Sequence, residues 1–290
     1  MLKFWQFLAA VDQPQPSWLG ALELLILITG CGLLIRWAQN GFGARALAHK
    51  PSRRHSMTPW LPFGILILWF GLLVVAGSAI TAFFDTADET VKLMALYIST
   101  GCVDILLTLT ILVLGHFYFT RGLAGFGLSL CTVTKDALWG LIHYLAVMPL
   151  VVGTIYLIQF IGEAISGDGF QLPMHESLKA IMDNPSLPVV VAIAVSVIVI
   201  IPIFEELLFR GLLQSSLVSY MGNWPGIAAT SLIFAVLHAN WTHWLPLFLL
   251  SCGFGYAYEK SGSLWRPIFM HMIFNGTNVA MLVFQPNLVN

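Results

Sequence analysis

Charged residues are what this sequence lacks most. Only 9% of its 290 residues are Asp, Glu, Lys or Arg, whereas 58% are hydrophobic and the mean hydropathy is +0.84. Soluble domains carry about 25% charged residues, so the composition excludes an ordinary soluble protein and indicates a chain surrounded by lipid. The net charge of −1 offers no basic surface to phosphates, so no nucleic-acid partner is expected.

The sequence also lacks paired cysteines and internal repeats. Cys31, Cys102, Cys131 and Cys252 are scattered and form no C-x-x-C pair, so they are expected to be small buried hydrophobic residues rather than disulfides or metal ligands. Inverted repeats are typical of transporters, but the polar residues gather in the last four apolar segments. The composition and the position of these polar residues therefore predict one all-α, polytopic membrane bundle whose last four helices enclose a hydrophilic cavity.

Apolar windows between charged breaks predict about eight transmembrane helices. The sixth and seventh are short for a bilayer about 30 Å thick. The expected segments are Trp18–Trp37, Trp60–Phe84, Leu93–Phe119, Ala137–Ile161, Leu187–Phe209, Gly226–His238, Trp244–Tyr258 and Leu264–Phe284.

The loops between these segments differ in charge. The loop Arg36–Pro59 is basic, whereas Asp85–Lys92 and Glu163–Ser186 are mainly acidic. The positive-inside rule places the basic loop in the cytoplasm. Both termini are then outside, the fifth helix runs inward, and Glu205 to Arg210 are expected toward the cytoplasmic side. This pattern favours a bacterial inner membrane.

Two acids and a base interrupt the fifth apolar segment, at Glu205, Glu206 and Arg210. A charge at the centre of a membrane helix costs roughly 2.5–3.5 kcal/mol on the lowest scales, so these groups are expected to be paired, hydrated or functional. Glu206 and Arg210 are four residues apart and can form an ion pair. Glu205 is offset from Glu206 by about 100°, which leaves it free to face a cavity.

Two later apolar segments carry further polar groups. His238 ends the sixth segment, and His271 and Asn275 lie one turn apart on the eighth, so the last two share a face. Polar stripes on apolar helices turn toward the bundle interior, which predicts a shared, water-bearing cavity. A carboxylate can deprotonate water there, while imidazole and amide groups orient that water or donate to an oxyanion.

The signatures of several other protease classes are missing. The sequence has no H-E-x-x-H and no G-x-S-x-G, and His175-Glu176 is followed by Ser-Leu-Lys, which does not complete a zinc protease helix. Hydrolysis by this chain would therefore need neither an activated serine nor that zinc motif.

Three motifs in order carry a specific resemblance. E-E-x-x-x-R at Glu205, F-x-x-x-H at Phe234 and H-x-x-x-N at His271 together resemble the CAAX protease and bacteriocin-processing family of intramembrane endopeptidases. The resemblance covers about Leu187 to Phe284, so residues 1–186 are expected to be N-terminal membrane helices and residues 187–290 the catalytic core of the same membrane unit.

The resemblance implies cleavage of a peptide bond near or within the membrane, at a site open toward the cytoplasm. It implies that Glu205 activates water with help from His238, and that His271 and Asn275 stabilise the oxyanion. The expected substrate is a membrane-associated protein or peptide, and whether it is prenylated stays open.

The same resemblance implies that Glu206 and Arg210 are supporting residues. Metal use stays open, because Glu205, His238 and His271 could bind a catalytic zinc as in a metalloendopeptidase; the metal-free scheme is favoured because no short-spaced histidine pair marks a zinc site. Two other functions remain as alternatives: a transporter using the same polar cavity, and a non-catalytic family member that gives immunity to a bacterial peptide.

Overall fold

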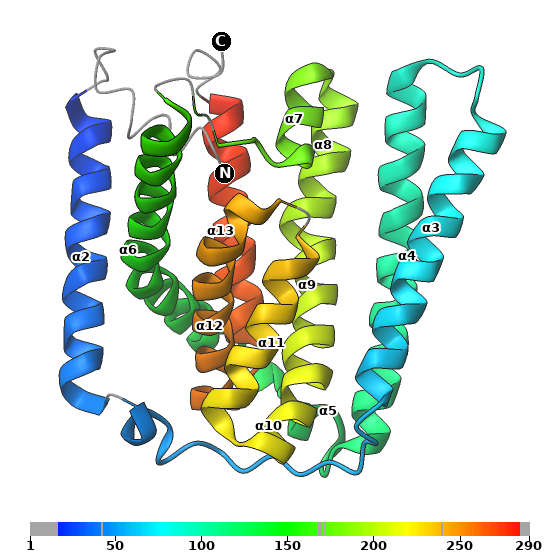
Figure 1. Ribbon diagram of the computed structural model, residues 1–290. Coiled ribbons are helices and arrows are strands. Elements are labelled where there is room, and N and C mark those ends of the chain that lie inside the picture. The colour runs from blue at the N-terminus through cyan, green and yellow to red at the C-terminus, as the bar shows by residue number, and fades with distance from the viewer. Residues whose placement is uncertain (1–16, 42, 168–169, 171, 239, 285–290) are drawn as a thin grey trace.

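A computed structural model describes residues 17–41, 43–167, 170, 172–238 and 240–284 of the chain (Figure 1). Within these ranges the secondary structure is helical, and the one strand-like contact is an isolated bridge between His55 and Phe119. The expected all-α class is therefore confirmed.

Twelve α-helices make up the described bundle. They are α2 (Ser17–Gly41), α3 (Leu61–Phe83), α4 (Glu89–Tyr118), α5 (Gly122–Phe126), α6 (Val133–Ser166), α7 (Glu176–Asp183), α8 (Leu187–Val195), α9 (Ile201–Glu206), α10 (Ser215–Met221), α11 (Asn223–Leu237), α12 (Trp244–Ser261) and α13 (Trp265–Phe284). α6 packs against α2, α12 and α13, so helices from both parts of the chain form one bundle.

Four helical runs among the described residues are long and apolar enough to cross a membrane: Leu61–Phe83, Glu89–Tyr118, Leu130–Ser166 and Leu187–Met221. Two shorter apolar helical stretches are Leu24–Gln39 and Asn223–Leu237. All eight expected segments are helical, and the number that spans the bilayer stays a prediction.

The sixth and seventh expected spans form a hairpin. α11 starts beside α10, ends part of the way along the bundle, and is followed by a turn and by α12, which returns to the same end (Figure 1). At 1.5 Å per residue, the 15 residues of α11 extend about 22 Å, less than the roughly 30 Å hydrocarbon core. The hairpin therefore ends part of the way along the bundle, and His238, the half-buried residue after α11, lies at that depth.

The long run from Leu187 to Met221 contains two π-helical stretches, Ser196–Ile200 and Leu207–Gln214. The first precedes Pro202, which has no backbone N–H to donate to the preceding turn. The Ile201 N–H bonds instead to the carbonyl of Ser196, five residues back. Wider turns of this kind change which side chains face one another, and the two stretches flank the acidic pair of α9.

One end of the bundle is basic. It consists of segments 43–60, 119–136 and 257–266. Contacts across the bundle hold these segments together, because Lys50 Nζ donates to Glu259 Oε2 at 2.7 Å and Arg266 Nε donates to Asp136 Oδ1 at 2.6 Å. We call these three segments the basic end.

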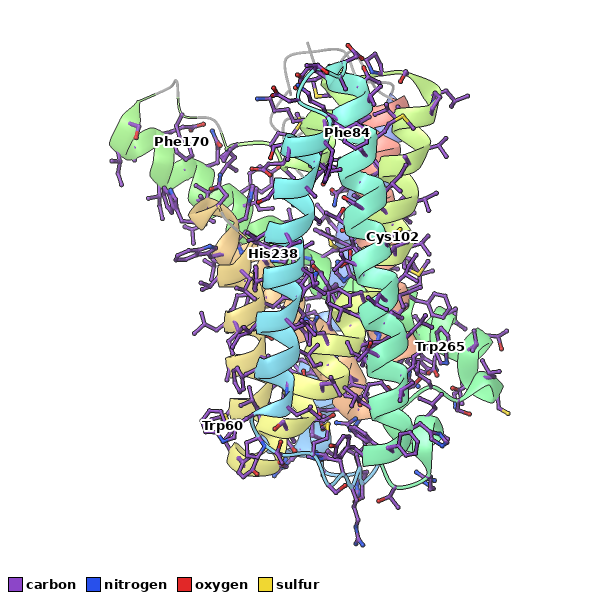
Figure 2. The ribbon with its side chains drawn as sticks, turned by 90° about the vertical axis from the view of Figure 1, so that its right-hand side faces the viewer. Trp60, Phe84, Cys102, Phe170, His238 and Trp265 are labelled. Atoms are coloured by element: carbon purple, nitrogen blue, oxygen red, sulfur yellow. The ribbon has the colours of Figure 1, made fainter. Side chains whose placement is uncertain are left out.

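The opposite end consists of segments 84–92, 163–167 and 173–187, and we call it the acidic end. Figure 2 shows Trp60 and Phe84 at opposite ends of α3, with Phe170 toward the acidic end and His238 between the two ends. The position of a site along the bundle can therefore be described by its distance from the basic end and from the acidic end.

The expectation of buried cysteines is wrong. Cys31, Cys102 and Cys131 are exposed on the surface of the described bundle and Cys252 is half-buried, all with free thiols. Apolar side chains of a membrane helix can face lipid as readily as the protein interior, so hydrophobic surroundings in the sequence do not predict burial here.

Candidate active site

The acidic pair of α9 and the arginine that follows it lie inside the bundle. Arg210 Nη1 donates to Glu206 Oε1 at 2.8 Å, which confirms the ion pair predicted from their spacing. Both side chains are completely buried. Arg210 Nη2 also donates to Ser251 Oγ at 2.6 Å, so the guanidinium is tied to α12 as well as to its own helix.

Two aromatic rings complete the surroundings of this guanidinium. Its carbon atom lies 4.7 Å from the ring centroid of Phe234 and 5.1 Å from that of Phe254. A desolvated cation over an aromatic face gains about 2 kcal/mol. Arg210 is thus held by a carboxylate, a hydroxyl and two rings, in an arrangement that fixes Glu206.

His271 of α13 joins the same cluster. Its Nδ1 lies 2.9 Å from Glu206 Oε1 and its Nε2 lies 3.8 Å from Glu205 Oε2. The ring also stacks on Phe254, with centroids 5.2 Å apart. Because Glu206 already accepts from Arg210, it acts as an ionised acceptor, and His271 donates from Nδ1. The second ring nitrogen then points toward Glu205 as a lone pair in neutral histidine or as a donor in imidazolium.

His238 is oriented by the backbone. Its Nδ1 lies 2.7 Å from the carbonyl oxygen of Phe234, and since a carbonyl can only accept, Nδ1 carries the proton. The other ring nitrogen of a neutral His238 is therefore an acceptor. Phe234 packs between the two imidazoles, with its ring centroid 4.6 Å from that of His238 and 6.0 Å from that of His271.

Asn275 lies one turn beyond His271 and contacts the first π-helical stretch. Its Nδ2 donates to the carbonyl of Val197 at 2.8 Å. This bond uses one of the two amide protons and fixes the side chain, leaving a second proton and the amide oxygen for another partner.

A pocket of about 1040 Å³ reaches this cluster. Glu205, His238, His271 and Asn275 all line it, together with residues of α9, α11, α12 and α13. Glu206 and Arg210 lie behind that lining. The structure thus brings the four expected catalytic residues to one cavity and puts the two expected supporting residues next to them.

The pocket wall includes elements that the sequence did not indicate. Trp69 of α3 lines it, and so do residues 173–179 at the start of α7. The Trp69 indole N–H donates to Asp104 Oδ1 at 2.9 Å, which gives the isolated buried acid of α4 a partner. The lining therefore extends beyond the last four helices. The only signal of this in the sequence is a tryptophan in one apolar segment, Trp69, and an isolated acid in the next, Asp104.

Two buried carboxylate oxygens at the site have no hydrogen-bond partner among the described residues. They are Oε2 of Glu205 and Oε2 of Glu206. A buried carboxylate oxygen without a partner is costly, so the Glu205 atom, which belongs to a pocket-lining residue, is available to a water molecule or a substrate N–H.

The described residues contain no group of three His, Cys, Asp or Glu side chains placed to hold a metal ion. Glu205, His238 and His271, the expected zinc candidates, line one pocket but do not form such a group. The arrangement does not fit a zinc centre, and we derive no step through a metal.

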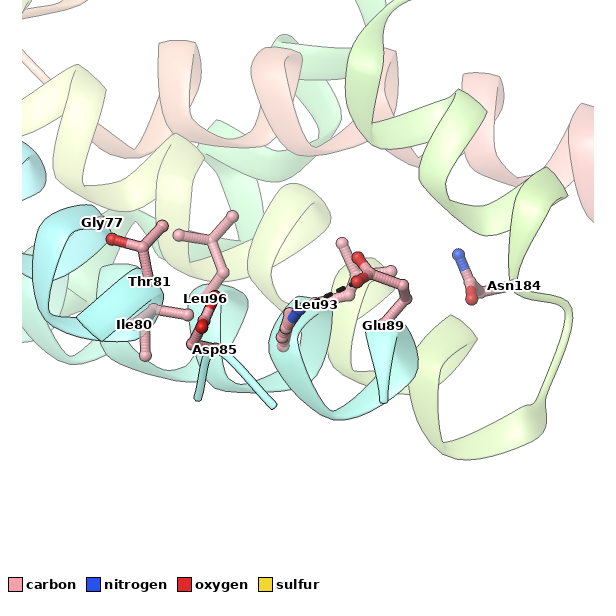
Figure 3. A pocket seen from close by; sticks show the side chains of 9 residues that line it. Gly77, Ile80, Thr81, Asp85, Glu89, Leu93, Leu96 and Asn184 are labelled. Carbon is pink, nitrogen blue, oxygen red and sulfur yellow. Dashed lines mark hydrogen bonds and ion pairs between the residues drawn. The ribbon is translucent and has the colours of Figure 1, made fainter. Parts of the chain in front are cut away.

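A second, smaller pocket lies at the acidic end, away from the cluster. It has a volume of about 540 Å³ and is lined by residues of α3 and α4, by Asp85 between them and by Asn184 (Figure 3). Its only ion pair between described residues joins Lys92 to Glu89 at 2.9 Å. Its lining contains carboxylates but no imidazole, so it lacks the combination of carboxylate and imidazole groups found in the larger pocket.

Residues 187–277 match the family model described as "Type II CAAX prenyl endopeptidase Rce1-like". This match confirms, over that segment, the family resemblance carried by the three motifs. The matched residues include Glu205, Glu206, Arg210, His238, His271 and Asn275.

Three curated relatives match part of the chain. An "Uncharacterized 24.3 kDa protein" of Escherichia coli is 28% identical over 43% of the chain and 59% of its own length. "Putative membrane peptidase YdiL" of Bacillus subtilis (strain 168) is 29% identical over 38% of the chain and 44% of its own length. "Uncharacterized protein YpbD" of the same organism is 30% identical over 37% and 52%. The chain thus spans about half the length of the curated relatives it matches, and no solved structure matches it.

Proposed function

We propose that this chain is a membrane-embedded endopeptidase that hydrolyses peptide bonds of membrane-associated proteins or peptides. The observation that carries the proposal is the position of Glu205, a carboxylate with an unpaired oxygen that lines a large pocket beside two imidazoles. The family match and the relative named as a membrane peptidase support it. Its long apolar helices need a bilayer, and the loop charges together with the bacterial relatives support a bacterial inner membrane.

Glu205 would act as the general base. Its free oxygen accepts a proton from a water molecule, whose oxygen attacks the carbonyl carbon of the scissile peptide bond. The carboxylic acid formed on Glu205 then protonates the leaving amine as the C–N bond breaks, which restores the carboxylate. Such a base or acid contributes typically 10²–10⁴-fold to the rate.

His238 would position the water. Because its Nδ1–H is held by the Phe234 carbonyl, its other nitrogen offers a lone pair that accepts a hydrogen bond from the second O–H of the water. This leaves the water lone pair directed away from both protein groups and available for attack.

His271 and Asn275 would stabilise the oxyanion. Asn275 has a second amide proton besides the one bonded to Val197. Because its Nδ1 donates to Glu206, His271 would donate to the oxyanion from Nε2 in its imidazolium form. In this scheme the Arg210 ion pair fixes Glu206, which in turn fixes the His271 ring.

The test is cleavage of a fluorogenic, membrane-partitioning peptide library by the purified protein and by Glu205→Gln. The variant keeps the shape of the side chain but cannot take a proton, so we expect at least about a 100-fold loss of rate. Glu89→Gln, which changes an exposed carboxylate at the acidic end, is the matched control and should keep wild-type activity. Undiminished cleavage by Glu205→Gln would refute the proposal.

Two further measurements distinguish this proposal from a metalloenzyme and from a transporter. A chelator should leave wild-type cleavage unchanged, whereas loss of activity would indicate a metalloenzyme. Solute uptake into sealed vesicles containing the protein, without any peptide cleavage, would favour the transporter alternative.

A further inference from the structure

The pocket extends in one direction only. Its lining runs from Glu205 and His271 toward residues 173–179 and 240–243, and residues 173–179 belong to the acidic end. No described residue of the basic end lines it. On α12 the pocket touches Leu247 and Leu250, in the half of that helix farther from the basic end.

The opposite direction is closed by a layer of buried side chains. Below Arg210, Gln214 donates to the carbonyl of Gly255 at 3.0 Å and to Glu259 Oε1 at 3.1 Å. Tyr258 donates to the carbonyl of Phe126 at 2.9 Å. Arg210, Gln214, Tyr258 and Glu259 are all 0% exposed, so water does not reach this layer between the cluster and the basic end.

Basic residues of the loop between α2 and α3 contact this buried layer from the side of the basic end. Glu259 accepts from Lys50 at 2.7 Å and from Arg53, and the Arg53 guanidinium lies 3.8 Å from the Tyr258 ring centroid. These contacts hold the loop between α2 and α3 against the basic end of α12.

The distribution of basic residues orients the molecule. The chain has 13 lysines and arginines, and most lie near or within the basic end. These are Arg36, Arg45, Lys50, Arg53, Arg54, Arg121, Lys135, Lys260 and Arg266. The acidic end contributes only Lys92 and Lys179 among its described residues. An excess of Lys and Arg in short loops marks the cytoplasmic side.

From these observations we infer that the catalytic pocket opens to the extracytoplasmic side of the membrane, and that its substrate is a peptide segment presented there or in the outer leaflet. This replaces the expectation of a site open to the cytoplasm, because the buried layer of Gln214, Tyr258 and Glu259 separates the pocket from the basic end. The substrate class rests on the proposed peptidase function, whereas the orientation of the pocket does not.

The pocket walls indicate what such a segment looks like. Besides its polar base, the pocket is lined by apolar side chains, among them Pro173, Met174, Leu247, Leu250 and Phe274. An extended segment with apolar residues around the scissile bond would bury them there at about 25 cal/mol per Å². A soluble polar peptide gains no such contribution.

The orientation can be tested by thiol labelling in a background from which the four native cysteines are removed. Lys179→Cys lies at the pocket rim, Asn278→Cys lines the pocket without a role in the proposed chemistry, and Ser52→Cys lies on the exposed basic loop. With a membrane-impermeant reagent on intact bacterial cells, we expect Lys179→Cys and Asn278→Cys to be modified. Ser52→Cys should be modified only after permeabilisation.

The matched negative control is Ser216→Cys, which is 1% exposed and should stay unmodified under both conditions. Modification of Ser52→Cys in intact cells, with Lys179→Cys protected, would overturn the orientation. Modification of Lys179→Cys without Asn278→Cys would show that the pocket is not open to water from that side, and would overturn the inference as well.

The substrate class is tested separately with a peptide that the purified protein cleaves. That peptide is placed beside a single membrane span, in one reporter on the extracytoplasmic side and in another on the cytoplasmic side. We expect only the extracytoplasmic reporter to be cut in cells, with loss of cutting in Glu205→Gln. Cutting of the cytoplasmic reporter alone would overturn the inference, whereas the absence of any cleavable peptide would contradict the proposed function and leave the labelling result intact.

Discussion

Replacing Arg210 by methionine should destabilise the protein strongly. The change removes the 2.8 Å bond to Glu206 and the 2.6 Å bond to Ser251 and leaves a carboxylate that is completely buried without its cation. Breaking a buried ion pair in this way costs about 3–5 kcal/mol. At roughly 2–4 °C per kcal/mol for a large domain, the Tm should fall by about 10 °C.

The assay is thermal unfolding in detergent of the wild type, Arg210→Met, His271→Ala and the double variant Glu206→Gln/Arg210→Met. His271→Ala should lose less than Arg210→Met, because Glu206 keeps its cation. The double variant should recover much of the loss, since no charge is left unpaired. Equal Tm values for Arg210→Met and His271→Ala, or no recovery in the double variant, would refute the pairing argument.

Two other predictions concern stability alone. Glu259→Ala should lower the Tm by several degrees, because it leaves two cations and an amide without their buried acceptor, whereas the exposed Glu89→Ala should change it little; similar shifts would contradict this. Gly211→Ala should cost about 1–3 kcal/mol, since a Cβ there would meet Phe126 Cε2 at 2.6 Å. Gly77→Ala, with open space at its Cβ, should be neutral, and denaturation midpoints of the two variants compare them directly.

The sequence predicted those parts of the site that depend on helix periodicity. Glu206 and Arg210 pair because residues four apart share a helix face, and this holds in any fold that keeps the helix. The same rule put His271 and Asn275 on one stripe, and both line the pocket. That the helices carrying these residues would come together with the one carrying His238 was predictable only because polar groups avoid lipid.

Contacts set by tertiary packing could not be predicted in this way. The bond between Trp69 and Asp104 joins two helices, and nothing in the spacing along either helix specifies the partner. The same is true of residues 173–179, whose position at the pocket depends on how α7 folds back over the bundle. The short α11 and α12 were visible as short apolar segments, but their arrangement as a hairpin depends on the turn at Trp241–His243.

The direction in which the pocket opens illustrates the same limit. Loop charges indicate which end of the bundle is cytoplasmic, but only side-chain packing shows which end is closed. The buried layer of Gln214, Tyr258 and Glu259 consists of residues from two separate helices, and its continuity cannot be deduced from either helix alone.

The most direct test of the central claim is product analysis by mass spectrometry after incubation of the purified protein with a membrane peptide in water labelled with oxygen-18. The account predicts one labelled oxygen in the new C-terminal carboxylate of the N-terminal fragment made by the wild type, and none in the fragment with the new amino terminus. That labelled fragment should be lost in Glu205→Gln at a temperature where both proteins are folded. Equal formation of the labelled product by wild type and variant would contradict the claim that Glu205 activates water for peptide hydrolysis.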